Sequence, residues 1–480
     1  MIGTRLGSLL SEGWADVFAQ KRTVRRAIEQ ALALPAACGR RTISRTICAL
    51  GRQHRDWSAD SKLFSRSKWD EDALFRPVVA TDLSRYPRGP VTVALDDTKT
   101  PKTGRKIPGA SWQRDPMFPP FHLNFICALR FLPVSLLFPH YREGQHSARA
   151  FPVRFRDVPV VKKPGKRATD EERAAWREAK KTRNLSVSAR ETLTRFRAEL
   201  DRQGARDRRL LAVGDGSFCN RTMFRTPPDR IDLLARCRWD AKLCFPAPPG
   251  TPRRHAPNKF SPDQVRKDTA IPWKTIRVFF GGCPRTVRVK DLTGVLWQRG
   301  AGTRPLRLLI TAPTPYKVTP KGPTYDREPA GSLCTDTTSP INLLAQAAFD
   351  RWQIEVNHRE EKDILGLGDA QVRSPRSVER HPPFQVALYS LIHLAGLLEY
   401  GPGRTDDSLP LPKGRRKANR PSLLDLLSLL RKDSLQTRGH TANIETITPA
   451  NETRGMNCET PGTASQPRVL AENVIVNAYT

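Results

Sequence analysis

The first 75 residues of the chain repeat apolar positions with the period of helices. Leu6, Leu10 and Trp14 share one face, and a further apolar cluster covers residues 27–34. Apolar residues spaced by three and four positions line one side of a helix. The pattern predicts a helical N-terminal domain over residues 1–78, which is a candidate for DNA binding.

After this segment the pattern changes to short β-branched runs that end on acids. Residues 91–95 (VTVAL) predict a strand followed directly by Asp96 and Asp97. Residues 209–214 (RLLAVG) predict a second strand, followed directly by Asp215. Runs of this length and composition, bounded by turn residues, are typical of buried strands. Each predicted strand therefore delivers a carboxylate at its end.

The same α/β core is expected to cover residues 79–236. Its other elements are two adjacent strands over 122–129 and 131–138 and a charged helix over 170–181. From 237 to 328, β-type runs separated by Gly, Pro and charged turns predict a β-rich insertion. The insertion strands are expected over 276–280, 286–289, 294–298 and 306–311.

The core resumes over residues 329–400 with helical sequence. Residues 342–365 contain neither Gly nor Pro and predict one continuous helix, and a second helix is expected over 384–398. The last segment, 401–480, is predicted to hold a basic patch, a short Leu-rich helix and a disordered tail, over 413–420, 422–432 and 434–480.

The charge of the chain adds information about its binding partner. The sequence has 81 Lys and Arg against 48 Asp and Glu, a formal net charge of +33. Such an excess repels itself in a compact state and indicates a polyanionic partner, with nucleic acid the leading candidate. Ribosomal, chromatin and membrane-surface proteins are also basic, so charge alone does not select a function.

Several classes of protein are disfavoured by the remaining composition. The nine cysteines form no CxxC pair, which argues against a zinc ribbon or a disulfide framework. The N-terminus lacks the pattern of a signal peptide, and no apolar stretch reaches the ~18 residues of a membrane span. We expect a cytoplasmic, nucleoid-associated protein without a membrane partner.

Candidate chemistry gathers on the predicted helix over 342–365. Arg351, Glu355, His358 and Lys362 follow one another at offsets of 4, 3 and 4 residues. At 3.6 residues per turn these side chains fall along one stripe. On an exposed helix the stripe would be an ordinary ladder of ion pairs. Its importance depends on whether the two strand-end acids lie beside it.

Three carboxylates gathered from two strand ends and a helix can hold two magnesium ions. Carboxylate oxygens and water are the ligands that Mg²⁺ prefers, and paired ions serve phosphoryl transfer. We predict Asp97, Asp215 and Glu355 as the catalytic residues and metal ligands. Asp96 is the alternative to Asp97, because a shift of one residue at a strand end reverses the face.

Three motifs together resemble the DDE transposases of bacterial insertion sequences, a group marked by the signature Y-x2-R-x3-E-x6-K. The motifs are LDDT at 95–98, GDGS at 214–217 and RWQIEVNHREEK at 351–362. Arg351, Glu355 and Lys362 match the signature, whereas its Tyr position falls on Ala348. The resemblance spans roughly residues 80–395 and includes a β-rich insertion between the second Asp and the Glu.

The resemblance implies an RNase H-like catalytic core within the α/β class. It implies cleavage of DNA at the ends of an insertion sequence and joining of the 3′ ends to target DNA, with two Mg²⁺ or Mn²⁺ ions. Arg351 and Lys362 would contact phosphates beside the cut. It favours Asp97 as first acid, because the family's first acid is commonly followed by Thr. Assembly as a homodimer or larger complex on DNA is also implied.

Other residues are weaker candidates for contacts with DNA. The basic residues after the first acid would hold backbone phosphates or form a solvated loop; they are Lys99, Lys102, Arg105 and Lys106. His358 is a candidate phosphate contact. Trp297 would stack on a flipped base or serve as an ordinary core tryptophan.

Two alternative functions stay open on the sequence. One is another RNase H-fold nuclease, which would share the carboxylates without joining strands. The other is a decayed or domesticated copy that binds DNA without cutting it.

Overall fold

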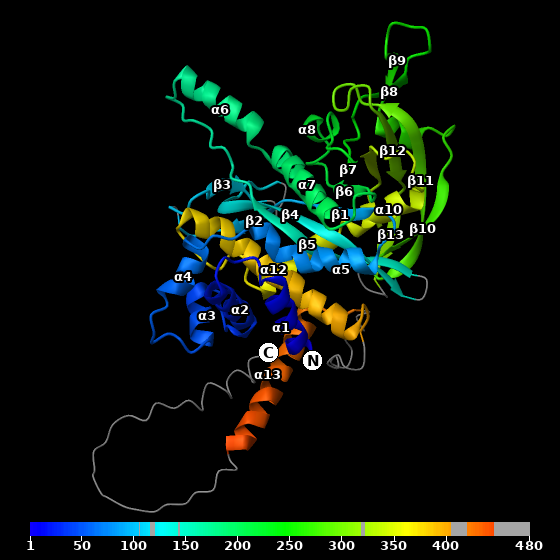
Figure 1. Cartoon of the computed structure of the whole chain (residues 1–480). Coiled ribbons are helices and arrows are strands. Elements are labelled where there is room, and N and C mark those ends of the chain that lie inside the picture. The colour runs from blue at the N-terminus through cyan, green and yellow to red at the C-terminus, as the bar shows by residue number, and fades with distance from the viewer. Residues whose placement is uncertain (105, 116–120, 143–144, 318–321, 405–419, 446–480) are drawn as a thin grey trace, which may run out of the picture. The chain divides into compact units, whose positions relative to one another are not determined.

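The structure, a computed structural model, describes residues 1–104, 106–115, 121–142, 145–317, 322–404 and 420–445. Internal contacts divide the chain into one compact unit over residues 1–433 and another from residue 434 onwards. The first unit is a mixed α/β structure, in which most of the described strands form one large mixed sheet packed against helices and two strands pair separately (Figure 1). The predicted α/β class is confirmed at this level.

The N-terminal segment is helical, as its periodicity predicts, and continues further than expected. Its elements are α1 (Ile2–Gly13), α2 (Lys21–Ala36), α3 (Ile43–Ala49), α4 (Ser58–Ser65), the 3-10 helix η1 (Glu71–Phe75) and α5 (Arg76–Arg85). Trp14 is fully buried, and its ring lies 5.2 Å from that of Phe384 on the long helix α12 (Pro375–Tyr400). The N-terminal helices therefore pack on α12.

The first half of the sheet begins with the predicted strand β1 (Val91–Leu95). It is followed by β2 (Thr98–Pro101), β3 (Ser111–Arg114), β4 (Phe125–Arg142), β5 (Gln145–Asp157), β6 (Leu210–Gly214) and β7 (Ile231–Arg236). β4 pairs antiparallel with β1, β2, β3 and β5, whereas β1, β6 and β7 are parallel neighbours.

The two strands expected over 122–129 and 131–138 are one strand, β4. No turn forms between the two runs, because Arg130, the residue between them, is not of a type that favours turns. The strand β4 continues through Arg130, whose side chain pairs with Asp97. The continuous apolar run thus belongs to a long, largely buried strand.

The second half of the sheet is the predicted β-rich insertion. Its elements are β8 (Leu243–Pro246), β9 (His255–Phe260), α9 (Pro262–Lys267), β10 (Lys274–Phe280), β11 (Cys283–Leu296), β12 (Pro305–Thr311), and β13 (Thr314–Lys317) and β14 (Thr324–Arg327), which pair apart from the large sheet. A further strand, β15 (Ala330–Cys334), follows the predicted end of the insertion, where helical sequence was expected. The strands expected over 286–289 and 294–298 are parts of β11, joined through an irregularity at Gly294, whose φ is +75°. Because β15 pairs with β7, the insertion extends the same sheet.

The remaining helices are α6 (Asp170–Thr182), α7 (Leu185–Arg202), α8 (Arg221–Phe224), α10 (Ile341–Asp350), α11 (Gln353–Arg359), the π-helical turn η2 (Glu360–Ile364) and α13 (Leu423–Glu445). The continuous helix expected over 342–365 is therefore wrong. It breaks at Arg351 and Trp352, where the hydrogen bonds tighten to i→i+3, and it widens at η2, where Glu360 and Glu361 are both buried.

The C-terminal segment departs from the prediction at the tail. The Leu-rich helix expected over 422–432 extends to Glu445, so the first residues of the expected disordered tail are helical. Residues 446–480, and most of the basic patch over 413–420, lie outside the described residues. In the described part of the chain, no helix has the length and apolar character needed to cross a membrane.

His381 makes the packing of α12 sensitive to acid. It is buried, its ring lies 5.0 Å from that of Phe64, and burial together with the charge of Lys102 lowers its pKa to about 3. The folded state thus keeps it neutral where the unfolded chain protonates it. Its contribution to stability is complete above pH ~6.5 and is lost as pH falls from there towards 3.

We expect His381→Leu to flatten the acid side of the stability profile. Wild type should lose about 2 kcal/mol more than the variant between pH 7 and 5, from 1.36 kcal/mol per pH unit over the ~1.5 units below the unfolded pKa. Urea titrations at the two pH values measure this difference. Equal losses in both proteins would contradict a neutral, buried His381.

Candidate functional site

The acids that follow β1 and β6 lie side by side at one edge of the sheet. The two strands are parallel neighbours with Ala94 opposite Val213. Asp96 and Asp215 each come two residues further along their strands. Because the register is shared, the carboxyl ends of both strands deliver an acid to the same place.

The helical segment α10–α11 brings a third acid to these two. Arg351 lies at the break between the helices, and its Nη1 is 3.6 Å from Asp96 Oδ2 and 3.5 Å from Glu355 Oε1. One guanidinium thus lies between a strand-end acid and the helix acid. The predicted association of the helix with the strand ends is therefore seen in the structure.

Asp96 and Asp97 point to different partners. Asp96 is 8% exposed, and its Oδ2 lies 3.6 Å from Nε2 of His358. Asp97 turns to β4, where Nε of Arg130 donates to its Oδ2 at 2.8 Å. Consecutive side chains of extended backbone alternate in direction, which explains the divergence. The structure thus places Asp96, the alternative, beside Arg351, and places the favoured Asp97 in an ion pair on β4.

The pKa shifts show that Asp96 acts electrostatically on both of the other acids. Burial raises the pKa of both Asp215 and Glu355, and the nearby charge of Asp96 raises each further. Burial also acts to raise the pKa of Asp96, but His358 and Arg351 outweigh it and lower the pKa. Burial and Asp96 therefore outweigh the opposing effect of Arg351 at both Asp215 and Glu355, so the pKa of each stays raised.

His358 and Lys362 complete the stripe in different ways. His358 is buried, and Glu361 lies 3.7 Å from its Nδ1; burial lowers its pKa, but Asp96 and Glu361 outweigh this and raise it to about 9. His358 therefore contacts acidic side chains inside the protein and is not exposed at the surface. Lys362 is half-buried; burial lowers its pKa, whereas Glu361, Asp363, Asp96 and Glu355 oppose that shift. Lys362 thus remains near the acids although the π turn changes the helical register.

The predicted lysine-rich loop after β1 is used partly by the protein itself. Lys102 is buried, and its Nζ donates to the carbonyls of Gly368 and Ala370 at 2.8 Å each. Burial lowers its pKa to about 8. Lys99 donates to the carbonyl of Arg114 at 2.7 Å and is only half-buried. Lys106 is exposed, and Arg105 lies outside the described residues.

Trp297 lies just after β11 and is half-buried. Its ring makes an edge contact with that of Phe224, with centroids 5.9 Å apart. It also lines a cavity of about 260 Å³ together with Cys219, from the loop after Asp215, and Arg238. The structure therefore supplies a packing role for Trp297, and base stacking stays a prediction.

A second cleft, of about 390 Å³, adjoins the acids. Its lining includes Gly214 at the end of β6, Arg351 and the exposed ring of Trp352. The guanidinium of Arg327 lies over this ring, 5.3 Å from its centroid. Arg236 also lines the cleft, which therefore combines cations with an aromatic surface. Trp352 and Arg327 were not among the residues predicted to contact DNA.

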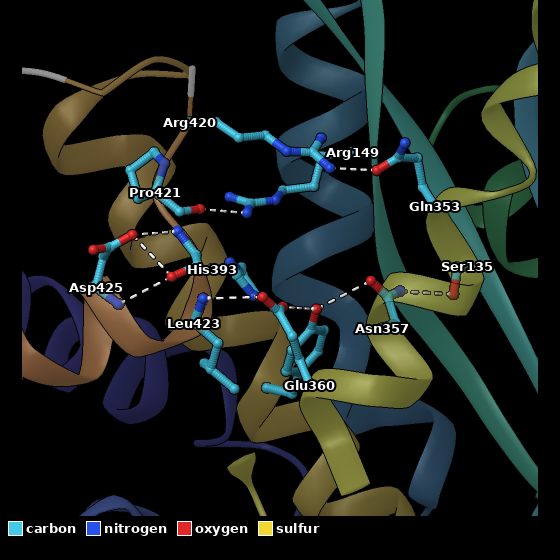
Figure 2. A network of polar contacts seen from close by, with 12 residues as sticks. Ser135, Arg149, Gln353, Asn357, Glu360, His393, Arg420, Pro421, Leu423 and Asp425 are labelled. Atoms are coloured by element: carbon cyan, nitrogen blue, oxygen red, sulfur yellow. Dashed lines mark hydrogen bonds and ion pairs between the residues drawn. The ribbon is translucent and has the colours of Figure 1, made fainter. Parts of the chain in front are cut away.

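A buried polar network holds the helix that carries Glu355 (Figure 2). Glu360 accepts hydrogen bonds from Tyr389 Oη at 2.7 Å, from His393 Nε2 at 3.2 Å and from the Leu423 amide at 3.2 Å. Burial opposes its ionisation, but His393, Arg149 and Tyr389 outweigh it and lower the pKa of Glu360 to about 2. Burial and Arg149 lower the pKa of His393 to about 4, so the imidazole is neutral at pH 7.

The segment before α13 joins this network to α11 and β5. Arg420 donates to Oε1 of Gln353 on α11 and to the carbonyl of Ala148 at 3.0 Å. Arg149 donates to the carbonyl of Pro421 at 2.5 Å (Figure 2). The sequence carries one signal for this set, the pair of adjacent glutamates in the 351–362 motif, and the prediction did not use it. Arg420 thus contacts α11 at Gln353, while α12 and the start of α13 contact the π turn that follows this helix.

The acids suit a metal ion in chemistry but are not assembled around one. No group of three or more His, Cys, Asp or Glu side chains within the described residues is arranged to hold a metal ion. Arg351 and His358 instead neutralise Asp96. The burial of Asp215 and Glu355 and their repulsion by Asp96 are the features that a divalent cation would relieve.

No protein-family model matches the sequence, and no curated protein matches it either. Functional interpretation therefore depends on the residues and their geometry.

Proposed function

We propose that this protein is a metal-dependent DDE transposase that cuts DNA at the ends of an insertion sequence and joins the 3′ ends to target DNA. The observation that carries the proposal is that Asp96 and Asp215 follow neighbouring parallel strands, and that Arg351 lies between Asp96 and Glu355. Burying acidic side chains near one another costs free energy, so acids gathered from positions so far apart in the chain indicate a common function.

The fold supports an RNase H-like core as part of this proposal. Parallel β1 and β6 place their acids together, antiparallel β4 and β5 extend the sheet on the other side of β1, and α11 supplies the third acid. The β-rich insertion lies between Asp215 and Glu355 in the sequence, as the resemblance implies. We assign Asp96 as the first acid, in place of Asp97.

Mg²⁺ or Mn²⁺ is the cofactor that these donors suit. We propose that Asp96, Asp215 and Glu355 hold two ions, which would activate the attacking oxygen and stabilise the leaving oxygen. Arg351 and His358 would then be released from Asp96. Arg351 is in place to contact a phosphate beside the acids, and Lys362 to hold another; buried Lys102 and His358 are left out of the DNA contacts.

The charges around the acids support DNA as the substrate. The chain carries a net charge of +33, and the cleft beside the acids is lined by Arg236, Arg327 and Arg351 next to Trp352. Phosphates neutralise such a surface, and an exposed aromatic ring accepts stacked bases. A homodimer or larger complex on DNA belongs to the same proposal, because joining a pair of ends requires two sites.

The test is cleavage of labelled DNA that carries the ends of the element. We expect cuts at the ends with Mg²⁺ or Mn²⁺, none with EDTA, and joined products when target DNA is added. DNA of equal length without the ends is the control. Metal-dependent cuts without joined products would favour another nuclease of the same fold, and binding without any cut would favour a DNA-binding copy.

A further inference from the structure

The segment between β5 and α7 forms an arm with no packed surface of its own. No side chain from residue 159 to residue 184 is buried, and α6 within it stands away from the sheet (Figure 1). Thr169 and Glu172 form a capping box, with bonds of 3.0 and 3.2 Å. A 13-residue helix is marginal in water without packing, so caps and charges must support this one. An unpacked helix of this kind suits a partner outside the fold.

Both ends of the arm are anchored at the sheet edge that carries the acids. Asp157, the last residue of β5, lies opposite Phe131, which also pairs with Thr98 just after Asp97. At the other end, Ser186 accepts a hydrogen bond at 2.7 Å from Asn220 in the loop that follows Asp215. The arm therefore projects from the edge where DNA would lie.

One face of α6 is basic and aromatic, and the other is acidic. Residues 158–184 contain nine Lys and Arg against four Asp and Glu. Helical spacing places Arg173, Trp176, Arg177 and Lys180 on one face. The ammonium group of Lys180 lies 5.2 Å from the Trp176 ring centroid. Glu171 and Glu178 fall on the opposite face, whereas Asp170 and Glu172 flank the basic one, so α6 presents Arg173, Arg177 and Lys180 in one direction.

We propose that this arm, residues 159–184, binds the phosphate backbone of duplex DNA beside the carboxylate site, independently of sequence. The inference deepens the proposed function and rests on it for the position of the DNA. Charge complementarity identifies the partner: the basic face attracts phosphates, whereas without DNA a second copy of a chain with a net charge of +33 would be repelled.

The test compares two double variants that remove the same charge. Arg177→Gln with Lys180→Gln neutralises the basic face with residues that favour helix. Arg202→Gln with Arg206→Gln removes two exposed cations that precede β6, at the opposite sheet edge from the acids. Binding to a random-sequence duplex of about 30 base pairs is measured without metal, from about 50 to 200 mM salt.

The arm variant should bind about tenfold more weakly than wild type. Its plot of log K against log salt should be less steep by about 2, because each phosphate contact contributes about 0.9 to the steepness. The control variant should keep the wild-type slope. Equal losses of DNA affinity in both variants would show that only net charge matters. Unchanged DNA affinity in both would show that the arm does not contact DNA. A change of oligomeric state without DNA would make the arm a self-interface and overturn the proposal.

These outcomes separate the arm from the catalytic proposal. Arm-dependent binding by a protein that never cuts DNA would leave the arm in place and refute the transposase. Normal cutting with unchanged binding by the arm variant would do the reverse.

Discussion

Asp96→Asn should reduce metal-dependent cutting on the order of 10²–10³-fold or more, whereas Asp97→Asn should retain most of it. Asp96 lies beside Arg351 and His358 and acts electrostatically on Asp215 and Glu355. Its loss removes a negative oxygen from the place where a cation would bind. The measurement is the initial rate of end cleavage at saturating Mg²⁺, with DNA affinity measured separately.

Asp97→Asn is the matched control, because it makes the same chemical change one residue away. Asp97→Asn removes the ion pair between Asp97 and Arg130, in which the Asp97 carboxylate is one-fifth exposed. Such a partly exposed pair contributes modestly to stability. DNA affinity should not fall in either variant, since each removes a negative charge. A reversed result, with Asp97 essential and Asp96 dispensable, would mean that the strand end rotates when DNA and metal bind.

The ambiguity between these two acids shows where sequence reasoning stops. The pattern located the end of β1 at Leu95 and of β6 at Gly214, because β-branched runs that stop at acids are a local signal. Which acid faces the helix depends on Arg130, 33 residues away on β4. Alternation fixes that the two acids diverge, and only the tertiary partners decide their directions.

Helix geometry was hidden from the sequence for a related reason. Every residue from 342 to 365 tolerates a helix, so the local pattern gives no cause for a break or a π turn. The partners of Glu360 come from positions 29 to 63 residues later, on α12 and at the start of α13. The burial of Lys102 could not be predicted for the same reason, because the carbonyls that accept its hydrogen bonds lie more than 260 residues away in the sequence. π turns are frequent at functional sites, and this one directly follows α11, the helix that carries Glu355.

Glu360→Gln should lower the free energy of unfolding by about 3 kcal/mol at pH 7. The Glu360 carboxylate is buried, accepts three hydrogen bonds and lies near the buried cation Arg149. Glutamine keeps the shape but offers one acceptor oxygen, so donors from α12 and α13 lose partners and the cation loses its counter-charge. Urea unfolding at pH 7 measures the loss, with exposed Glu178→Gln as a control expected to change it by under about 0.5 kcal/mol.

The same variant has a defined dependence on pH. Because the pKa of Glu360 is lowered to about 2, its stabilisation is complete above the unfolded value of about 4.3 and is lost as pH falls from there towards 2. The deficit of Glu360→Gln should therefore be constant from pH 7 to about 5 and shrink below about 4. A deficit that persists unchanged at pH 3 would show that shape, and not charge, accounts for the loss.

The network should also couple the C-terminal segment to catalysis. Glu360 follows Glu355 by five residues, and Arg420 binds α11 through Gln353, so loosening either contact frees the helix that positions the third acid. In a temperature range where Glu360→Gln remains folded, the rate of end cleavage should fall by more than DNA affinity does, because binding depends on charges that the substitution leaves in place. Parallel losses of binding and cutting would instead indicate general unfolding, and unchanged cutting would show that α11 is held without Glu360.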